Sequence, residues 1–314
     1  MAGRLTQTFS QREGRPLVLA IGMFDGVHRG HQALLNKAVA EARAIRGEAA
    51  VLTFWPHPSV FFQVPEPTRL IFSPTLRAQR IFALGMDRII QLPFEASLAS
   101  RAAEDFPAWL KAQEPSLTKV FVGENWRFGK GRRGDARLLR ELGPPAGFAV
   151  ETLPRVTWQG EPISSSRIRE ALRQGDLTGA NDLLGAPFEY EAEVVPGRRL
   201  GRTLGFPTLN LPWTGDLLPR PGVYAMEVLR GDGTSRPAVA NLGFRPTVAE
   251  GDPEPLLEVH LLATGPAESL PGPGDLVHTT WRAFLRPEQR FANLAELKAQ
   301  IARDTVEARK FFHL

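Results

Sequence analysis

The sequence predicts an α/β domain with a Rossmann-like parallel sheet and helices on both faces, followed by an antiparallel β-barrel domain with a C-terminal helix. Two patterns predict this architecture. Short apolar runs alternate with helical periodicity between residues 17 and 184, which is typical of a parallel sheet flanked by helices. From residue 188 onward, apolar residues recur with a period of two, which favours antiparallel strands. The length of 314 residues also suits two domains.

The first half contains five apolar runs that are expected to be buried strands, at residues 17–21, 51–54, 88–92, 120–122 and 149–153. Helices are expected where apolar residues recur every three or four positions, at residues 34–45, 76–84, 135–142, 166–174 and 177–184. Gly143 and Gly175 follow two of these helices and are predicted to end them.

The second half begins with apolar residues alternating with glutamates over residues 188–194. Further strands are expected at residues 223–229, 237–242 and 256–262, between Pro and Gly turns. A last helix is predicted from Asn293 to about residue 312, because Glu296 follows Asn293 by three residues, as in a capping box. The change of period predicts domains of residues 1–185 and 186–314.

The composition excludes several classes of chemistry. The chain has no cysteine, which excludes disulfides, thiolate zinc sites, iron–sulfur clusters and cysteine nucleophiles. Residues 1–10 have no apolar core typical of a secretory signal, and no run approaches about 18 apolar residues. We therefore expect a cytoplasmic protein with no membrane partner.

The charge balance gives little reason to expect a nucleic-acid partner. Lys and Arg number 38 against 34 Asp and Glu, for a net charge of +4, which is weak for a nucleic-acid-binding protein. Arginine suits carboxylate and phosphate ligands, although a GC-rich genome produces the same arginine excess. The basic, Gly-punctuated segment 127–133 either covers an anionic ligand or is a solvated loop.

The strongest local signal is a glycine-rich segment, residues 22–31, between the first strand and the first helix. Glycines let the backbone approach a ligand, and a helix N-terminus offers free N–H groups to a phosphate. His28 and His31 share one helix face and can donate to one anion. Such a pair is often incidental, but its position between strand and helix favours a site. The segment predicts nucleotide contacts at Gly22, Phe24, Asp25, Gly26 and Gly30.

A second phosphate-binding segment is predicted at the start of the helix near residue 166. Ser164, Ser165 and Ser166 supply hydroxyls and backbone amides, and Arg169 adds a cation one turn later. Taken alone, such a serine run is more often a simple N-cap. Two such segments in one nucleotide-sized domain favour a binding site.

These segments resemble the bifunctional bacterial riboflavin kinase and FAD synthetase family. The pattern G-x-F-D-G-V-H-x-G-H at residues 22–31 is accompanied, in order and spacing, by family-like segments at 53–58, 122–129 and 163–169. Ser166 stands where the family usually has Thr, which keeps the hydroxyl. The resemblance implies an N-terminal nucleotidyltransferase that transfers AMP from ATP to FMN. Its catalytic residues would be His28, His31 and Arg169, with a flavin contact from Asn125.

The second half resembles riboflavin kinase, with G-R-x-L-G-F-P-T-x-N at residues 201–210 and further motifs at 221–224, 241–247, 257–260 and 286–291. In a strand, Thr208 and Asn210 project from one face, so both oxygens suit a Mg²⁺ that also binds ATP phosphates. The resemblance implies that Glu258 is the general base that accepts the proton of the riboflavin 5′-hydroxyl, with a flavin contact from Arg286. The nucleotide contacts of this half would be Gly201, Arg202, Gly205 and Pro207.

One segment departs from the family. Residues 263–278 are rich in Pro and Gly and lack the family's acidic-aromatic-Gly segment, which bears on how tightly the barrel holds flavin. Expected substrates are riboflavin, FMN and ATP, with FMN and FAD as intermediate and product. Two alternatives are that only one half is active, or that the barrel binds nucleic acid. The second would need aromatic residues interleaved with basic ones along strands, whereas these aromatics lie in Gly/Pro motifs. The sequence makes no prediction of oligomeric state.

Overall fold

The computed structural model describes residues 3–9, 14–197, 205–229, 234–244, 254–262 and 271–314. The chain forms two compact units, Met1–Ser165 and Ser166–Leu314. Helices α7 (Ser165–Gln174) and α8 (Leu177–Leu184) therefore fall almost entirely in the second unit. The change of sequence pattern lies further on, near residue 185, and the boundary between functional domains stays a prediction.

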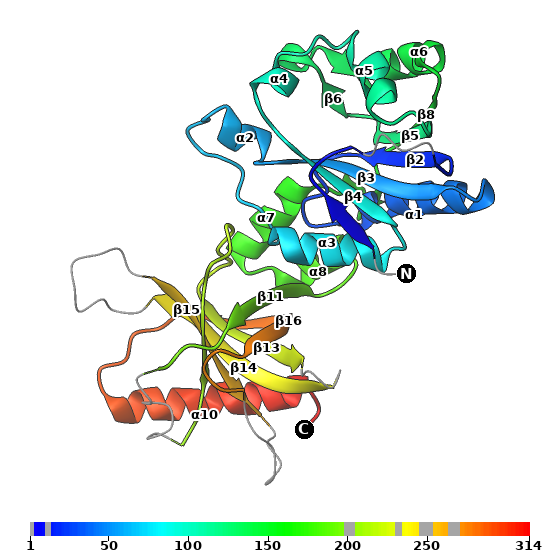
Figure 1. Cartoon of the computed structure of the whole chain (residues 1–314). Coiled ribbons are helices and arrows are strands. Elements are labelled where there is room, and N and C mark those ends of the chain that lie inside the picture. Colours follow the sequence, from blue (N-terminus) through cyan, green and yellow to red (C-terminus); the bar gives the residue numbers. More distant parts are fainter. Residues whose placement is uncertain (1–2, 10–13, 198–204, 230–233, 245–253, 263–270) are drawn as a thin grey trace. The chain divides into compact units, whose positions relative to one another are not determined.

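The first unit contains the predicted parallel sheet (Figure 1). Its strand order is β1-β4-β3-β2-β5-β8, and every neighbouring pair is parallel. Strands β3 and β4 lie on one side of β2, and strands β5 and β8 lie on its other side. Ligand crevices in such sheets lie at the carboxyl ends of the strands where the order reverses, which here means the end of β2. The strands are β1 Arg4–Thr6, β2 Leu17–Ile21, β3 Glu48–Trp55, β4 Arg88–Pro93, β5 Leu117–Gly123 and β8 Ala149–Leu153.

Helices cover both faces of this sheet. Leu17 and Leu19 of β2 pack in one core cluster with Leu139 of α6, while Val18 of β2 packs in the other with Leu35 of α1. Both clusters consist of buried apolar residues, so the sheet is buried on both sides as predicted. The helices of this unit are α1 Arg29–Ala44, α2 Pro58–Phe61, α3 Pro74–Ala83, α4 Ala96–Ala99, α5 Phe106–Gln113, the 3₁₀ helix Lys130–Arg132 and α6 Ala136–Ala146.

Two short hairpins complete the first unit. One pairs β6 (Arg127–Phe128) with β7 (Gly134–Asp135), and the other pairs β9 (Thr157–Trp158) with β10 (Glu161–Pro162). The sequence did not predict these two-residue strands, because they are too short for a period to be read. Among the residues that the structure describes, no helix has the length and apolarity needed to cross a bilayer.

The prediction that Gly143 ends a helix is wrong. Helix α6 runs through Gly143 and ends at Gly147, whose φ of +94° is left-handed. A Cβ at Gly143 would lie 2.5 Å from the side chain of Val150 on β8. Gly143 therefore lets the helix approach the sheet closely. Gly175 does end α7, with φ +80°, so that prediction is confirmed.

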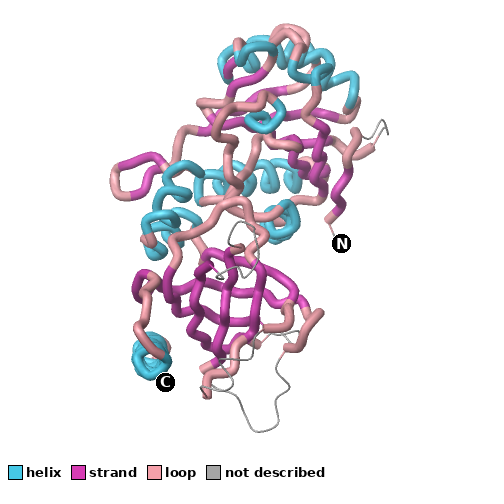
Figure 2. Tube along the Cα trace, turned by 90° about the vertical axis from the view of Figure 1, so that its left-hand side faces the viewer, coloured by secondary structure: helices cyan, strands magenta, loops and turns pink. Residues whose placement is uncertain are grey.

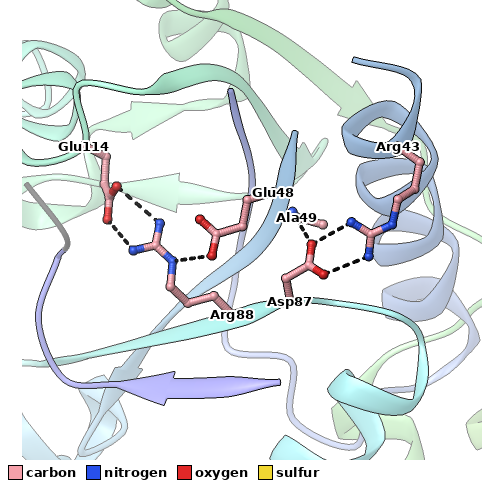
Figure 3. A network of polar contacts seen from close by, with 6 residues as sticks. All are labelled: Arg43, Glu48, Ala49, Asp87, Arg88 and Glu114. Atoms are coloured by element: carbon pink, nitrogen blue, oxygen red, sulfur yellow. Dashed lines mark hydrogen bonds and ion pairs between the residues drawn. The ribbon is translucent and has the colours of Figure 1, made fainter. Parts of the chain in front are cut away.

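The amino ends of β3 and β4 carry a polar network (Figure 3). The buried guanidinium of Arg88 donates to both carboxylate oxygens of Glu114, at 3.0 and 3.2 Å, and its Nε lies 3.3 Å from Glu48. Beside it, Asp87 accepts two hydrogen bonds from Arg43, at 2.7 and 2.9 Å. Buried ions persist only when they are paired in this way.

The second unit is a nearly closed antiparallel barrel, visible as the lower set of strands in Figure 2. Its strand order is β11-β16-β13-β14-β15-β12, and all neighbours are antiparallel. Beyond β11, the N–H of Val195 donates to the carbonyl of Asn210 at 2.9 Å and bridges the two edges. The strands are β11 Phe188–Glu193, β12 Leu209–Pro212, β13 Gly222–Leu229, β14 Ser235–Phe244, β15 Pro255–Leu261 and β16 Leu276–Pro287.

The longest strand, β16, was not predicted. Its pairing with β13 shifts register twice, between Val223 and Tyr224 and between Ala225 and Met226 of β13. Each bulge adds a residue to β16 and reverses the face on which the following side chains lie. The period of two that identifies a strand is therefore interrupted in the sequence.

The C-terminal helix α10 (Leu294–Phe311) begins as predicted, because the Asn293 side chain accepts from the Glu296 N–H at 2.9 Å. Its Ala308 packs with Val223 of β13 and Val239 of β14. These two residues lie on the outer face of the sheet, since their neighbours Tyr224 and Ala240 belong to the opposite, inner face. The helix therefore covers part of the outside of the barrel.

We expect Arg88→Met to destabilise the first unit strongly, because Glu114 would remain buried without its cation. The expected cost is about 3–5 kcal/mol in free energy of unfolding, measured by chemical denaturation. The control is Arg137→Met, which breaks an exposed pair with Glu141 and should cost under about 0.5 kcal/mol. Equal losses in both variants would contradict a special role for the buried pair.

Candidate functional sites

The glycine-rich loop leaves β2 at the switch point of the sheet, and hydrogen bonds from several elements hold it. The Gly22 N–H donates to the Leu52 carbonyl at 3.1 Å, and the Gln32 side chain donates to the Val27 carbonyl at 2.8 Å. Phe24 and Val27 adopt positive φ values of 50° and 43°. Such a backbone is costly for residues other than glycine and is kept where its surroundings enforce it.

Asp25 ties this loop to two distant segments of the first unit. Its Oδ1 accepts from the Ile71 N–H at 2.9 Å, and its carbonyl accepts from the Ser165 hydroxyl at 2.8 Å. Asp25 is only 3% exposed. The two segments predicted to bind phosphate therefore meet at Asp25 and Ser165.

His28 and His31 form a stacked pair at the start of α1. Their rings are 3.6 Å apart at 13°, and His28 Nδ1 accepts from the His31 N–H at 3.2 Å as the N-cap of the helix. His28 Nδ1 therefore carries no proton, which leaves Nε2 as the donor of the neutral ring. A Cβ at Gly30 would lie 3.1 Å from the His28 ring, so glycine gives the stack its room.

Burial keeps both histidines uncharged at neutral pH. It lowers the pKa of His28 to about 4. Burial, followed by the neighbouring His28, lowers the pKa of His31 well below its usual range. His31 Nδ1 is buried and has no hydrogen-bond partner among the described residues. The pair offers neutral donors rather than a cation.

Arg77 is a residue of this site that the sequence did not predict. It lies on α3, is 2% exposed, and donates to the Met23 carbonyl of the loop at 3.3 Å and to Gln91 at 3.2 Å. Burial lowers its pKa, and the charge of Asp25 opposes that change. The available signal was an arginine four residues before Ile81 on the apolar face of a predicted helix, where an unpaired charge is rare.

The other predicted residues of the adenylylation site lie in separate places. Ser164 and Asn125 are exposed, and Asn125 is in the turn after β5. Ser166 lies in the first turn of α7 and Arg169 one turn later, both in the second unit, and an Arg169 nitrogen donates to the Ser166 hydroxyl at 3.4 Å. Phe24 is 1% exposed in the core and contacts the His31 ring edge-on, so only its backbone is available to a ligand.

The second site is a cavity of about 290 Å³ between the outer face of the barrel and α10, lined by Thr208, Glu258, Arg286 and Asp304 among others. Its floor follows a row of directly opposed residues, of which those on four strands line the cavity and Asn210 on β12 continues the row beyond it. The row consists of Asn210, Glu258, Asn241, Val223 and Arg286, in the order β12, β15, β14, β13 and β16.

Arg286 is held in this cavity by the C-terminal helix. Its Nε and one terminal nitrogen donate to the two carboxylate oxygens of Asp304, at 2.8 and 2.6 Å. Asp304 is 7% exposed and also accepts from Gln300 at 2.8 Å. The predicted flavin contact is thus fixed in direction by a residue that the sequence did not indicate.

Only part of the motif at residues 201–210 lies within the residues that the structure describes. Gly201 and Arg202 lie outside the described residues. Gly205, with φ +90°, and Pro207 line a second cavity of about 210 Å³ beside β15. The Pro207 carbonyl lies 2.8 Å from His260 Nδ1, and Thr208 immediately precedes β12.

Comparison with known proteins matches each half of the chain to a different family. A family model described as FAD synthetase matches residues 10–167, and one described as riboflavin kinase matches residues 184–312. The bifunctional riboflavin kinase/FMN adenylyltransferase of Escherichia coli strain K12 is 39% identical over 97% of this chain and 96% of its own. The protein of that name from Pseudomonas fluorescens is 38% identical over 95% of this chain and 93% of its own.

A solved structure supports the fold over both units. The crystal structure of a protein from Streptococcus pneumoniae, named there a macrolide-efflux protein, has a TM-score of 0.83 with this chain at 28% identity. The match covers 97% of this chain and 98% of that one. We use this match only for the arrangement of strands and helices. The efflux function in its name is said of that protein and not of this chain.

The buried histidine predicts that stability falls in mild acid. Between about pH 6.5 and pH 4, the unfolded chain binds a proton at His28 that the folded chain excludes. The contribution of His28 to the free energy of unfolding should therefore be complete above pH 6.5. As the pH is lowered toward 4, the free energy of unfolding should fall by about 3 kcal/mol because of this residue.

The measurement is thermal melting across this range for the native chain and for His28→Asn, which keeps an N-cap acceptor. The variant should show the smaller loss on acidification. Identical pH dependence in the two proteins would contradict the burial of an uncharged His28.

Proposed function

Because the chain belongs to the bifunctional riboflavin kinase/FMN adenylyltransferase family, we propose which of its residues carry the two reactions. The chain phosphorylates riboflavin with ATP to give FMN, and it adenylylates FMN with a second ATP to give FAD and pyrophosphate. The riboflavin kinase match covers the barrel, and the FAD synthetase match covers the parallel sheet. We propose the functional boundary at 1–185 and 186–314, close to residue 184, where the riboflavin kinase match begins.

The observation that carries the adenylylation site is the neutral, stacked histidine pair at the start of α1. A phosphate oxygen of FMN attacks the α-phosphorus of ATP, and the bond to the bridging oxygen of pyrophosphate breaks. We propose that His28 Nε2–H and His31 donate hydrogen bonds to oxygens whose charge grows during this step. The N–H groups of α1 add their partial positive charge.

Further contacts are proposed for the same reaction. The backbone of residues 22–26 and of Gly30 would contact the nucleotide phosphates, supported by the strained and anchored loop. Ser164, Ser165 and Ser166 would donate to phosphate oxygens, and Arg169 would stabilise the negative charge of the departing pyrophosphate. Asn125 would contact the flavin.

For the kinase reaction, we propose that Glu258 takes the proton from the riboflavin 5′-hydroxyl as that oxygen attacks the γ-phosphorus and ADP leaves. The support is its place in the floor of a cavity that α10 covers. Gly201, Arg202, Gly205 and Pro207 would contact ATP, and Arg286, held by Asp304, would contact the flavin.

Thr208 and Asn210 suit a Mg²⁺ ion with few protein ligands. Both supply a neutral oxygen, and Asn210 lies directly opposite Glu258 while Thr208 lines the same cavity. Such a donor set leaves most of the coordination sphere to ATP oxygens. When bound, Mg²⁺ would neutralise charge on the transferred phosphoryl group. Because both steps use ATP, we propose that the protein works in the cytoplasm, with small molecules as its ligands and no nucleic acid.

We expect His28→Ala to stop the pathway at FMN. Losing a donor that acts in the transition state should lower the rate of FAD formation from FMN by about 10²- to 10³-fold, measured by chromatography of the flavins. Riboflavin phosphorylation in the same preparation should stay normal. His313→Ala, at an exposed histidine, is the control. An unchanged adenylylation rate in a folded His28→Ala protein would remove the pair from the mechanism.

We expect Thr208→Ala and Asn210→Ala to act only on the kinase. The Mg²⁺ concentration that supports half the maximal rate of riboflavin phosphorylation should rise about tenfold or more, while FAD formation from added FMN is retained. The control is Thr280→Ala, whose residue pairs with Glu189 and Glu227 away from the cavity. Equal losses in both reactions would show that the two residues do not belong to the kinase alone.

A further inference from the structure

We propose that Arg77 is a positioning residue of the adenylylation site, which fixes the Met23–Phe24 peptide so that the Phe24 N–H faces the nucleotide phosphates. The inference rests on the proposed contact between the loop at residues 22–26 and ATP. It goes further by assigning the group, on a helix outside the loop, that keeps this peptide in its binding orientation.

Two strands and a helix converge on the Met23 carbonyl. Arg77 of α3 donates to this carbonyl at 3.3 Å, and the Thr53 hydroxyl of β3 lies 3.5 Å from it. The second terminal nitrogen of Arg77 donates to Gln91 Oε1 at 3.2 Å. Thr53 and Gln91 are directly opposed in the register of β3 and β4, so their side chains project to the same face. Arg77 therefore joins the loop to both strands near their carboxyl ends.

The direction of the Met23 carbonyl decides where the Phe24 N–H points. A peptide unit is planar, and in its trans form the C=O and the N–H point in opposite directions. The Met23–Phe24 peptide is trans, and its carbonyl is turned toward Arg77. The Phe24 N–H consequently points away from Arg77.

The Phe24 N–H is available to a ligand. Phe24 is almost fully buried, yet its N–H finds no acceptor in the described ranges of the chain. The great majority of buried backbone N–H groups are paired. An unpaired one in the loop that follows β2, at the switch point of the sheet, indicates an anionic ligand that accepts from it.

The conformation of the loop needs a support of this kind. Phe24 adopts a φ of +50°, which costs energy for a residue with a side chain. Without the hydrogen bond from Arg77, the Met23 carbonyl is free to rotate and relieve this strain. The Phe24 N–H would then turn away from the phosphates, because the two groups belong to one rigid peptide.

A purely structural role would not require a cation at this position. Arg77 is almost fully buried, and its two hydrogen-bond acceptors are neutral oxygens. The negative charge of Asp25 offsets only part of the cost of burial. An apolar side chain of similar size would fill the same space without that cost. A residue that disfavours its own fold is expected at functional positions.

The experiment compares Arg77→Met, Arg77→Lys and His28→Ala in the full-length chain, with Arg80→Met as the matched control. Arg80 lies on the same helix, and its guanidinium stacks on the Phe72 ring at 4.5 Å. FAD formation from FMN is measured over a range of ATP and FMN concentrations with saturating Mg²⁺. Riboflavin phosphorylation and a melting curve are recorded for the same preparations.

Arg77→Met should lower kcat/KM for ATP in adenylylation about 10- to 100-fold, with a higher KM for ATP. The KM for FMN, riboflavin phosphorylation and the melting temperature should stay close to those of the native chain. Arg77→Lys should keep most of the native kcat/KM, because an ammonium group also donates to a carbonyl. Arg80→Met should behave like the native chain in both reactions.

Two results would overturn the role of Arg77. One is a folded Arg77→Met protein with the native kcat/KM for ATP. The other is a loss confined to kcat with both KM values unchanged, since a smaller folded fraction produces that pattern. His28→Ala separates this failure from failure of the site itself. A native rate in that variant too would show that the loop is not the adenylylation site, whereas a rate lost only in His28→Ala dismisses Arg77 alone.

Discussion

A sheet covered by helices on both faces can meet a ligand only at the ends of its strands, and this constraint governs the first unit. Alternate residues of β2 are buried in two separate cores, so no polar side chain can be placed along the strand itself. At the amino ends, Arg88 forms ion pairs with Glu114 and Glu48. At the carboxyl end of β2, the loop and the start of α1 carry the polar side chains of Asp25, His28 and His31. His31 Nδ1 lacks a partner there within the described part of the chain. One end of the sheet is closed by paired charges, and the other keeps hydrogen-bonding capacity.

The barrel also has a closely packed core, but its candidate site is placed differently. Its inner face is filled by large side chains such as Trp281 and Tyr224, which are 0% and 1% exposed and pack at 4.5 Å. The candidate kinase site lies instead in a cavity on the outer face, where we propose the chemistry takes place. There α10 turns an open sheet surface into a cavity, and Asp304 from that helix holds Arg286 at one end of the row that contains Glu258. The helix therefore lines the proposed kinase site as well as packing against the barrel.

Strand β16, Gly143 and Arg77 differ from the sequence predictions, each for its own physical reason. Strand β16 was missed because two bulges break its period. Gly143 is predicted to end a helix, but its missing side chain instead allows close packing on Val150. The sequence alone does not distinguish a glycine in a left-handed turn from one at a close approach. Arg77 was not predicted because the sequence does not distinguish a buried arginine from an exposed one. Its burial depends on contact with Met23, which lies 54 residues earlier in the chain.

The sequence by itself determined the two fold classes, the histidine pair at a helix start, and the face of the strand on which Glu258 lies. These depend on local periodicity and on residues a few positions apart, which the chain order states directly. Only the tertiary structure decided that Asn241 lies beside Glu258, that Ser165 meets Asp25, and that α10 covers the outer face of the barrel. The reason is physical, because strand register and helix docking follow from burying whole faces against distant segments. Glu258 is exposed on its strand, and it becomes a candidate base only because a helix that begins 36 residues further along the chain makes its surroundings part of a cavity.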